Sequence, residues 1–213
     1  MKNITWFALL GASLMLASCA KKDNTPSSSS TNTNNSGINI NSTPQFTATI
    51  NGSNVSLVSG STYSSGVSSS KQMGGTGATN NYEEPSTSIG NPNTNQPYLT
   101  INKGTITFPL LSSMPDTVTY YAFFAPKSYP YSINYTNGIE VDWIDANGNI
   151  YNTSMGTGDQ TGSTFAITAE KAVDLLGNYY VKVVINFSCT LYNSSGTAIK
   201  LTNGVYVGDF EDQ

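Results

Sequence analysis

A long alternation of apolar and polar side chains, at residues 179–191, limits the folds open to this chain. Every odd-numbered residue of the run is apolar, whereas Lys182, Asn186, Ser188 and Thr190 occupy even positions. A period of two is that of a β-strand with one buried face, and a helix, with a period of about 3.6, does not produce it. The run therefore predicts a strand and places Cys189 on its buried face.

Shorter alternating runs, separated by turn residues, recur along the chain. Asn51-Gly52 and Asn147-Gly148 are two-residue hairpin signals, and Lys103-Gly104 is a short turn between two runs. The other predicted strands lie at residues 46–50, 55–57, 99–101, 106–108, 118–124, 139–143, 150–153, 164–168, 198–201 and 205–207. Many short strands predict an all-β domain, either an antiparallel β-sandwich or a β-barrel.

Two stretches are less regular. Residues 59–97 are rich in Ser, Gly and Asn and contain Pro85, Pro92 and Pro97, which predicts a long loop or a set of irregular edge strands. Residues 169–176 are the only helix candidate, since Thr168 is a possible cap and Gly177 a stop. At most one short helix is therefore expected.

The amino-acid composition argues against several classes of function. Histidine is absent, all basic residues are lysines, and the formal net charge is −4. A chain without a basic face is a poor partner for nucleic acid. Without histidine, arginine, a Gly-x-Ser-x-Gly elbow or a phosphate-binding loop, most catalytic constellations are excluded. The sequence predicts no catalytic residue, no cofactor and no metal site.

The amino terminus has the pattern of an export signal. Lys2 precedes an apolar run at residues 4–16, which is shorter than the roughly 20 residues of a membrane-spanning helix. The run ends in Leu16-Ala17-Ser18-Cys19, which resembles the lipobox of bacterial lipoproteins. In that family the cysteine sulfur carries a diacylglyceryl group, the signal is cut before the cysteine, and the new amino terminus is acylated.

The resemblance implies lipidation of Cys19, with palmitate as the expected acyl chain. Because Ala20 rather than aspartate follows, it also implies sorting to the outer membrane of the cell envelope, on either the periplasmic or the surface face. An ordinary cleaved signal with an incidental cysteine is the alternative. A lipid on Cys19 leaves Cys189 unpaired, and Cys189 is then better explained as a small buried apolar residue than as a nucleophile.

Three segments follow from these patterns. Residues 1–18 are the predicted lipoprotein signal peptide. Residues 19–44 are the lipidated cysteine and a flexible tether rich in Ser, Thr and Asn, which lacks the apolar surface needed for folding. Residues 45–213 are a single β-rich domain.

The hairpins of this domain resemble those of small Gram-negative lipoproteins that carry a β-rich domain of unknown function. The likeness lies in residues 46–52, 141–149, 162–168, 187–192 and 201–206. It implies an all-β fold and an envelope location, but no activity, because this group offers none to carry over.

Two acidic motifs are candidates for chemistry. Asp145-x-Asn147-x-Asn149 begins like a calcium loop, but Ile150 and Gly156 occupy the positions of the required Gly and Glu, so a tight hairpin is favoured. Glu140 and Asp142 lie two apart on one strand, and paired carboxylates can hydrolyse glycosides. A solvated strand face is the favoured interpretation of that pair.

A third candidate is a stretch rich in aromatic residues and interrupted by Pro126 and Pro130. Its members are Tyr120, Tyr121, Phe123, Phe124, Tyr129, Tyr131 and Tyr135. Part of this set must belong to the core. The tyrosines on the proline-containing loop, Tyr129, Tyr131 and Tyr135, are possible ligand-binding residues, because a tyrosine offers an apolar ring and a polar tip.

The sequence therefore predicts a non-enzymatic binding or interaction module, held at the membrane by a lipid anchor, with a glycan or an envelope protein as its partner. One alternative is a glycan-active hydrolase that uses Glu140 and Asp142. Another is a structural, fimbria-like envelope subunit, which would present an incompletely paired sheet edge.

Overall fold

The computed structural model describes residues 37–60, 62–75, 77–91, 96–132, 138–175 and 178–212. Strands account for 58% of the chain and helix for 4%, which confirms the predicted all-β class. The one helix in the described ranges is α1 (Thr117–Phe123). The strands are β1 (Gln45–Ile50), β2 (Ser53–Val58), β3 (Ser64–Gln72), β4 (Asn80–Gly90), β5 (Tyr98–Asn102), β6 (Ile106–Pro109), β7 (Lys127–Ser128), β8 (Glu140–Ile144), β9 (Ile150–Asn152), β10 (Thr164–Leu175), β11 (Asn178–Tyr192) and β12 (Ala198–Glu211).

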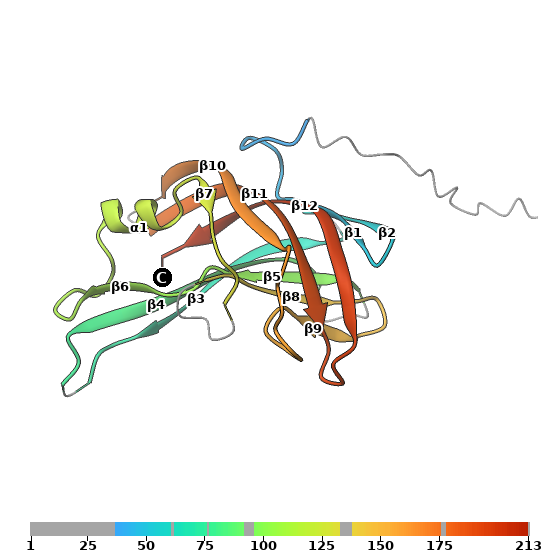
Figure 1. Ribbon diagram of the computed structural model, residues 1–213. Helices are drawn as coiled ribbons and strands as arrows, with labels where there is room; N and C mark the ends of the chain where they lie inside the picture. The colour runs from blue at the N-terminus through green and yellow to red at the C-terminus, as the bar shows by residue number, and fades with distance from the viewer. Residues whose placement is uncertain are drawn as a thin grey trace, which may run out of the picture. The chain divides into compact units, whose positions relative to one another are not determined.

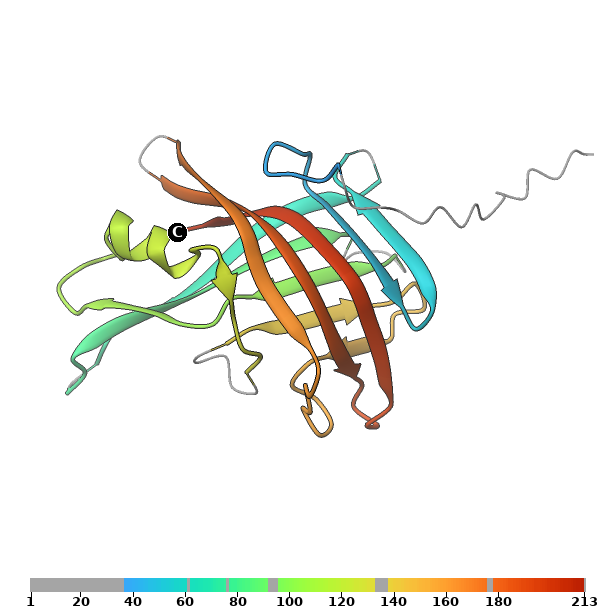
Figure 2. The same cartoon turned by 45° about the horizontal axis from the view of Figure 1, so that its top comes forward.

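These strands form one antiparallel sheet that curls into a half-barrel (Figure 1). The order is β2-β1-β12-β11-β9-β8-β5-β4-β3, with β10 paired to β11, β6 to β4 and β7 to β10. Figure 2 shows β10, β11 and β12 as one wall facing a second wall of β4, β5 and β8. The two walls meet where the hydroxyls of Tyr206 and Thr87 hydrogen-bond at 2.5 Å.

β11 is the strand predicted from the alternation. Val181, Val183 and Ile185 are fully buried, whereas Asn186 on the other face is exposed. β10 pairs with one edge of β11 and β12 with the other. Both edges are therefore hydrogen-bonded within the sheet, and the burial of each β11 side chain depends on the face of the sheet from which it projects. Cys189 is buried on the apolar face, and burial raises the pKa of its thiol to about 12. The prediction that Cys189 is a buried apolar residue is confirmed.

The hairpin signals are also confirmed. Asn51 and Gly52 join β1 to β2 with φ angles of 48° and 83°, and positive φ at both residues is what a type I′ turn requires. Between β8 and β9, the Asp145 carboxylate accepts hydrogen bonds from the backbone N–H groups of Asn147 and Asn149. The calcium-like motif is thus a tight hairpin, as predicted.

Residues 59–97, expected to be a loop or irregular edge strands, contain two regular strands. β3 is an edge strand, whereas β4 is a long inner strand that pairs with β3, β5 and β6. The alternation in β4 was hidden because several of its buried positions are polar, namely Asn81, Glu83 and Thr87. Pro92 lies outside the described residues.

The predicted strand at residues 118–124 is wrong, because α1 occupies this stretch. Asp116 caps the helix and accepts hydrogen bonds from the backbone N–H and the hydroxyl of Thr119, at 2.9 and 2.8 Å. Tyr120 and Phe124 are spaced by one helical turn and are both fully buried. The spacing of Tyr120 and Phe124 is compatible with one face of a strand and with one face of a helix, and the Asp116 cap favours the helix.

The predicted helix at residues 169–176 is also wrong, because β10 continues through it to Leu175. Residues from Ala169 to Leu175 pair with β11, from Val184 back to Asn178. The register shifts between Ile167 and Ala169, so a bulge at Thr168 stands where the helix cap was expected. Pairing with β11 has overridden the helical preference of the local sequence. Leu176 and Gly177 lie outside the described residues.

The segment before β1 packs against the convex face of the sheet. Ile38 and Ile40 contact a small cluster formed by Val184, Val205 and Val207. The ammonium of Lys182 donates to the carbonyl oxygen of Ser42 at 2.8 Å. Packing of the domain therefore begins upstream of residue 45.

Candidate functional site

The candidate site begins at a bulge between β5 and β6. The predicted turn at Lys103-Gly104 does not reverse the chain, because both strands pair in the same direction with β4. Residues 103–105 lie between the pairs Asn102–Ser86 and Ile106–Glu83, and Gly104 has a φ of 93°. The backbone N–H of Lys103 donates to the Pro85 carbonyl at 3.0 Å. Lys103 faces inward in phase with Leu99 and Ile101, and only 4% of this residue is exposed. The bulge shifts the phase, so that Ile106 and Phe108 of β6 also face inward.

Aromatic rings surround the Lys103 ammonium. Its Nζ atom lies 3.9 Å from the ring centre of Phe123 on α1 and 3.6 Å from that of Tyr129, which follows β7. Within the described residues, no carboxylate lies within ion-pair distance of this ammonium. Burial, and secondarily the positive charge of Lys127, lowers the pKa of Lys103 to about 7.

Two cavities adjoin at Tyr129. The first, of about 210 Å³, is lined by Lys103, Thr105, Phe123, Lys127, Tyr129 and Gly138. The second, of about 330 Å³, is lined by Ser128, Tyr129, Pro130, Tyr131, Gln160, Ser163, Thr164 and Phe165. Tyr129 lines both cavities. Two of the tyrosines predicted from the sequence, Tyr129 and Tyr131, therefore line these cavities, whereas Lys103, Lys127 and Gln160 were not predicted.

The predicted binding tyrosines are held by their own hydroxyls. Tyr129 donates to the carbonyl oxygens of Phe123 and Ala125, at 3.0 and 2.6 Å, and burial raises its pKa to about 12. Tyr131 donates to the carbonyls of Ser188 and Thr164, at 3.0 and 3.2 Å. The polar tips thus point into the fold, and only ring surfaces remain for a ligand. Tyr135 lies outside the described residues.

The interpretation of Glu140 and Asp142 as a solvated strand face is wrong. Glu140 is fully buried, and its Oε2 atom accepts from the Ser154 hydroxyl at 2.6 Å. Asp142 is partly buried and accepts from the amides of Asn152 and Asn102. Burial, and secondarily the charge of Glu140, raises the pKa of Asp142 to about 6. Neither residue lines either cavity at Tyr129, and their carboxylates accept hydrogen bonds from neighbouring side chains instead.

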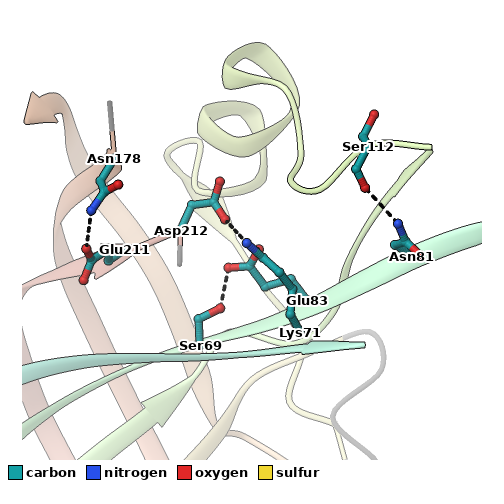
Figure 3. A network of polar contacts seen from close by, with 8 residues as sticks. All are labelled: Ser69, Lys71, Asn81, Glu83, Ser112, Asn178, Glu211 and Asp212. Carbon is teal, nitrogen blue, oxygen red and sulfur yellow. Dashed lines mark hydrogen bonds and ion pairs between the residues drawn. The ribbon is translucent and has the colours of Figure 1, made fainter. Parts of the chain in front are cut away.

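A second buried acidic cluster joins the two walls, and sequence reasoning missed it (Figure 3). Lys71 on β3 lies 3.1 Å from Asp212, which follows β12, and 3.8 Å from Glu83 on β4. Ser69 donates a hydrogen bond to Glu83. Burial is the main cause that raises the pKa of Glu83 to about 7, and the negative charge of Asp212 adds to it. The cluster fastens the end of β12 to the β3–β4 hairpin.

Asn81 extends the polar interior beside this cluster. Its side-chain amide donates to the Ser112 and Leu110 carbonyls, at 2.9 and 3.1 Å, and its oxygen accepts from the Gly74 N–H at 2.6 Å. Figure 3 shows the contact with Ser112 beside Glu83. This one buried side chain therefore holds the loop between β6 and α1 against β4.

Neither a metal-binding group nor a membrane-spanning helix is found among the described residues, and the comparisons with known proteins do not indicate a function. Among the residues described, no group of three His, Cys, Asp or Glu side chains is placed to hold a metal ion. Within the same ranges, no helix is long and apolar enough to cross a membrane. Comparisons with protein-family models, curated proteins and solved structures found no match for this chain. The likeness to small β-rich lipoproteins thus stays a prediction.

Proposed function

We propose that this chain is a non-enzymatic binding module, anchored to the outer membrane through a lipid on Cys19, whose ligand is a glycan. The glycan lies across the two cavities that share Tyr129. The single observation that carries the proposal is that Tyr129 lines both cavities, together with Phe123 in the first and with Tyr131 and Phe165 in the second.

Sugars suit these cavities because they present both C–H faces and hydroxyl groups. Aromatic rings take up the apolar faces, and polar residues such as Ser128 and Ser163 line the second cavity. The hydroxyls of both tyrosines are already bonded to the backbone. The rings are consequently fixed before a ligand arrives, which reduces the entropy lost on binding.

The hydrolase alternative has less support. An acid–base pair must reach its substrate, but Glu140 is fully buried and Asp142 is held by two amide side chains. The carboxylates of both residues are directed into the network around Asn152 and Ser154. These contacts favour a binding role over glycoside hydrolysis.

The glycan proposal predicts that replacing the aromatic ring of Tyr129 weakens glycan binding strongly. The full-length chain is screened in detergent on a glycan array, beside Tyr129→Leu and Tyr129→Phe. The leucine variant is expected to lose about tenfold or more in affinity, as for a central aromatic contact. The phenylalanine variant keeps the ring and should stay within about threefold of the wild type. Equal binding by all three proteins, or no glycan binding by the wild type, would contradict the proposal.

The anchor proposal predicts that Cys19→Ala releases the protein from the membrane. Two or more acyl chains hold a protein firmly, and without them nothing in the described residues offers a spanning helix. The checks are membrane fractionation and incorporation of labelled palmitate. Cys189→Ala is the matched control and should keep both the label and the membrane association, because Cys189 is buried. A labelled, membrane-bound Cys19→Ala variant would refute the anchor.

A further inference from the structure

The Lys103 side chain is a buried charge, and the described part of the chain places no carboxylate within ion-pair distance of it. Only 4% of the residue is exposed, and it lines a cavity of about 210 Å³ instead of packing against a carboxylate. Burying a charged group without a partner is costly, so proteins ordinarily pair such a group or place it at a binding site. An ammonium that faces a cavity is satisfied when an anion enters.

A second positive charge lies at the same cavity. Lys127 lines it and is close enough to lower the pKa of Lys103. None of the described residues that line this cavity is acidic. Glu170, whose charge acts on Tyr129, is not part of the lining. The electrostatic environment therefore favours a negative group and disfavours a cation.

We propose that the Lys103 cavity is a subsite for a negatively charged sugar residue, whose carboxylate or sulfate lies between Lys103 and Lys127. This inference rests on the proposed glycan-binding function and names its ligand class. The next residue of the glycan lies beyond Tyr129, in the cavity of about 330 Å³. The rings of Phe123 and Tyr129 hold the Lys103 ammonium in place for the anion.

The subsite has a characteristic pH dependence. The pKa of Lys103 is lowered to about 7, so its ammonium is the main form at pH 6 and a minor form at pH 8. Lys127 and Tyr129 are the titratable groups that face it among the described residues, and the pKa of Tyr129 lies at about 12. A sugar carboxylate stays ionised throughout this range. Affinity for an acidic glycan should therefore fall about tenfold from pH 6 to pH 8.

The test compares matched acidic and neutral glycans on the full-length chain by calorimetry. The panel holds uronic-acid oligosaccharides with their methyl esters, and sulfated oligosaccharides with their desulfated forms. At pH 6 the better acidic series should bind about tenfold more tightly than its neutral counterpart. Lys103→Met should remove that preference and the pH dependence together, while neutral glycans still bind. Lys171→Met, an exposed lysine of β10, is the control and should behave as wild type.

The outcomes separate this inference from the proposed function. Equal affinity for acidic and neutral members, or an acidic preference that persists unchanged in Lys103→Met, overturns the anionic subsite but leaves glycan binding intact. Binding of no glycan by the wild-type chain overturns both. Whether the uronic or the sulfated series binds better identifies the source of the charge.

Discussion

Replacement of Gly208 by alanine should lower the free energy of unfolding by about 3 kcal/mol, the upper part of the range for overpacking a core. A methyl group on Gly208 would lie on the ring of Tyr206, 2.6 Å from its Cε1 atom and closer still to its hydroxyl end. That ring cannot easily move, because it is fully buried and its hydroxyl is bonded to Thr87 on the facing wall. Urea denaturation measures the loss.

A strand glycine with space around it supplies the control for this substitution. A methyl group on Gly66 of β3 would meet only the Ser88 hydroxyl, at 3.4 Å, which is close to an ordinary contact. Gly66→Ala should therefore change the free energy of unfolding by less than about 0.5 kcal/mol. If the Gly208 variant proved as stable as the Gly66 variant, the contact between the two walls at Tyr206 would not be the rigid one described.

Replacement of Glu83 by glutamine should make the protein more stable at pH 8 and leave its stability at pH 5 nearly unchanged. The folded-state pKa of Glu83 is raised from 4.5 to about 7. Its contribution to stability is therefore present at low pH and is lost as the pH rises through about 7. An uncharged amide avoids the buried negative charge, and the gain at pH 8 is about 2 kcal/mol. Lys71 keeps Asp212 as its partner, at 3.1 Å.

Denaturation curves at pH 5, 6.5 and 8 check this prediction. In the wild type the free energy of unfolding should fall across this range, and in Glu83→Gln the fall should be smaller. The neighbouring carboxylate provides a matched control, because Glu84 accepts a hydrogen bond from Ser70 at the surface of the same strand pair. Glu84→Gln should retain the wild-type slope. A glutamine variant at position 83 that is less stable than wild type at pH 8 would show that the cluster stabilises the fold through the Glu83 charge.

The strands could be predicted where one face is buried and the other solvated. Residues 179–191 come closest to this condition, because the odd positions are mostly buried while Lys182, Asn186 and Ser188 on the other face are partly or fully exposed, so alternation revealed β11. β4 does not satisfy it, because Asn81, Glu83 and Thr87 hold inward positions that apolar residues would ordinarily take. Polar residues are buried there because partners from other strands and loops complete their hydrogen bonds, and no local pattern reveals such partners.

The two misplaced elements show the same limit. Tyr120 and Phe124 fit a strand or a helix equally well until the Asp116–Thr119 cap is recognised. Residues 169–175 have a helical composition, yet pairing with β11 makes them strand. In both cases the deciding contact lies outside the window in which a period is measured.

Only some of the residues that line the two cavities could be singled out from the sequence. Tyr129 and Tyr131 stood out because aromatic residues beside Pro130 are unusual on a loop. Lys103 did not stand out as a site residue, although it continues the apolar phase of Leu99 and Ile101, and a lysine in that phase is a signal of a buried charge. Its aromatic neighbours come from α1 and from the segment after β7, so only the fold brings them together.

A crystal structure of the full-length chain with the tightest glycan from the array would locate the ligand directly. We expect sugar rings on both sides of Tyr129, with a carboxylate or sulfate group within hydrogen-bond distance of Lys103 Nζ. A glycan bound elsewhere would contradict this, for instance in the convex-face cavity of about 580 Å³ that Ile38 and Asn186 line, with the Tyr129 cavities empty.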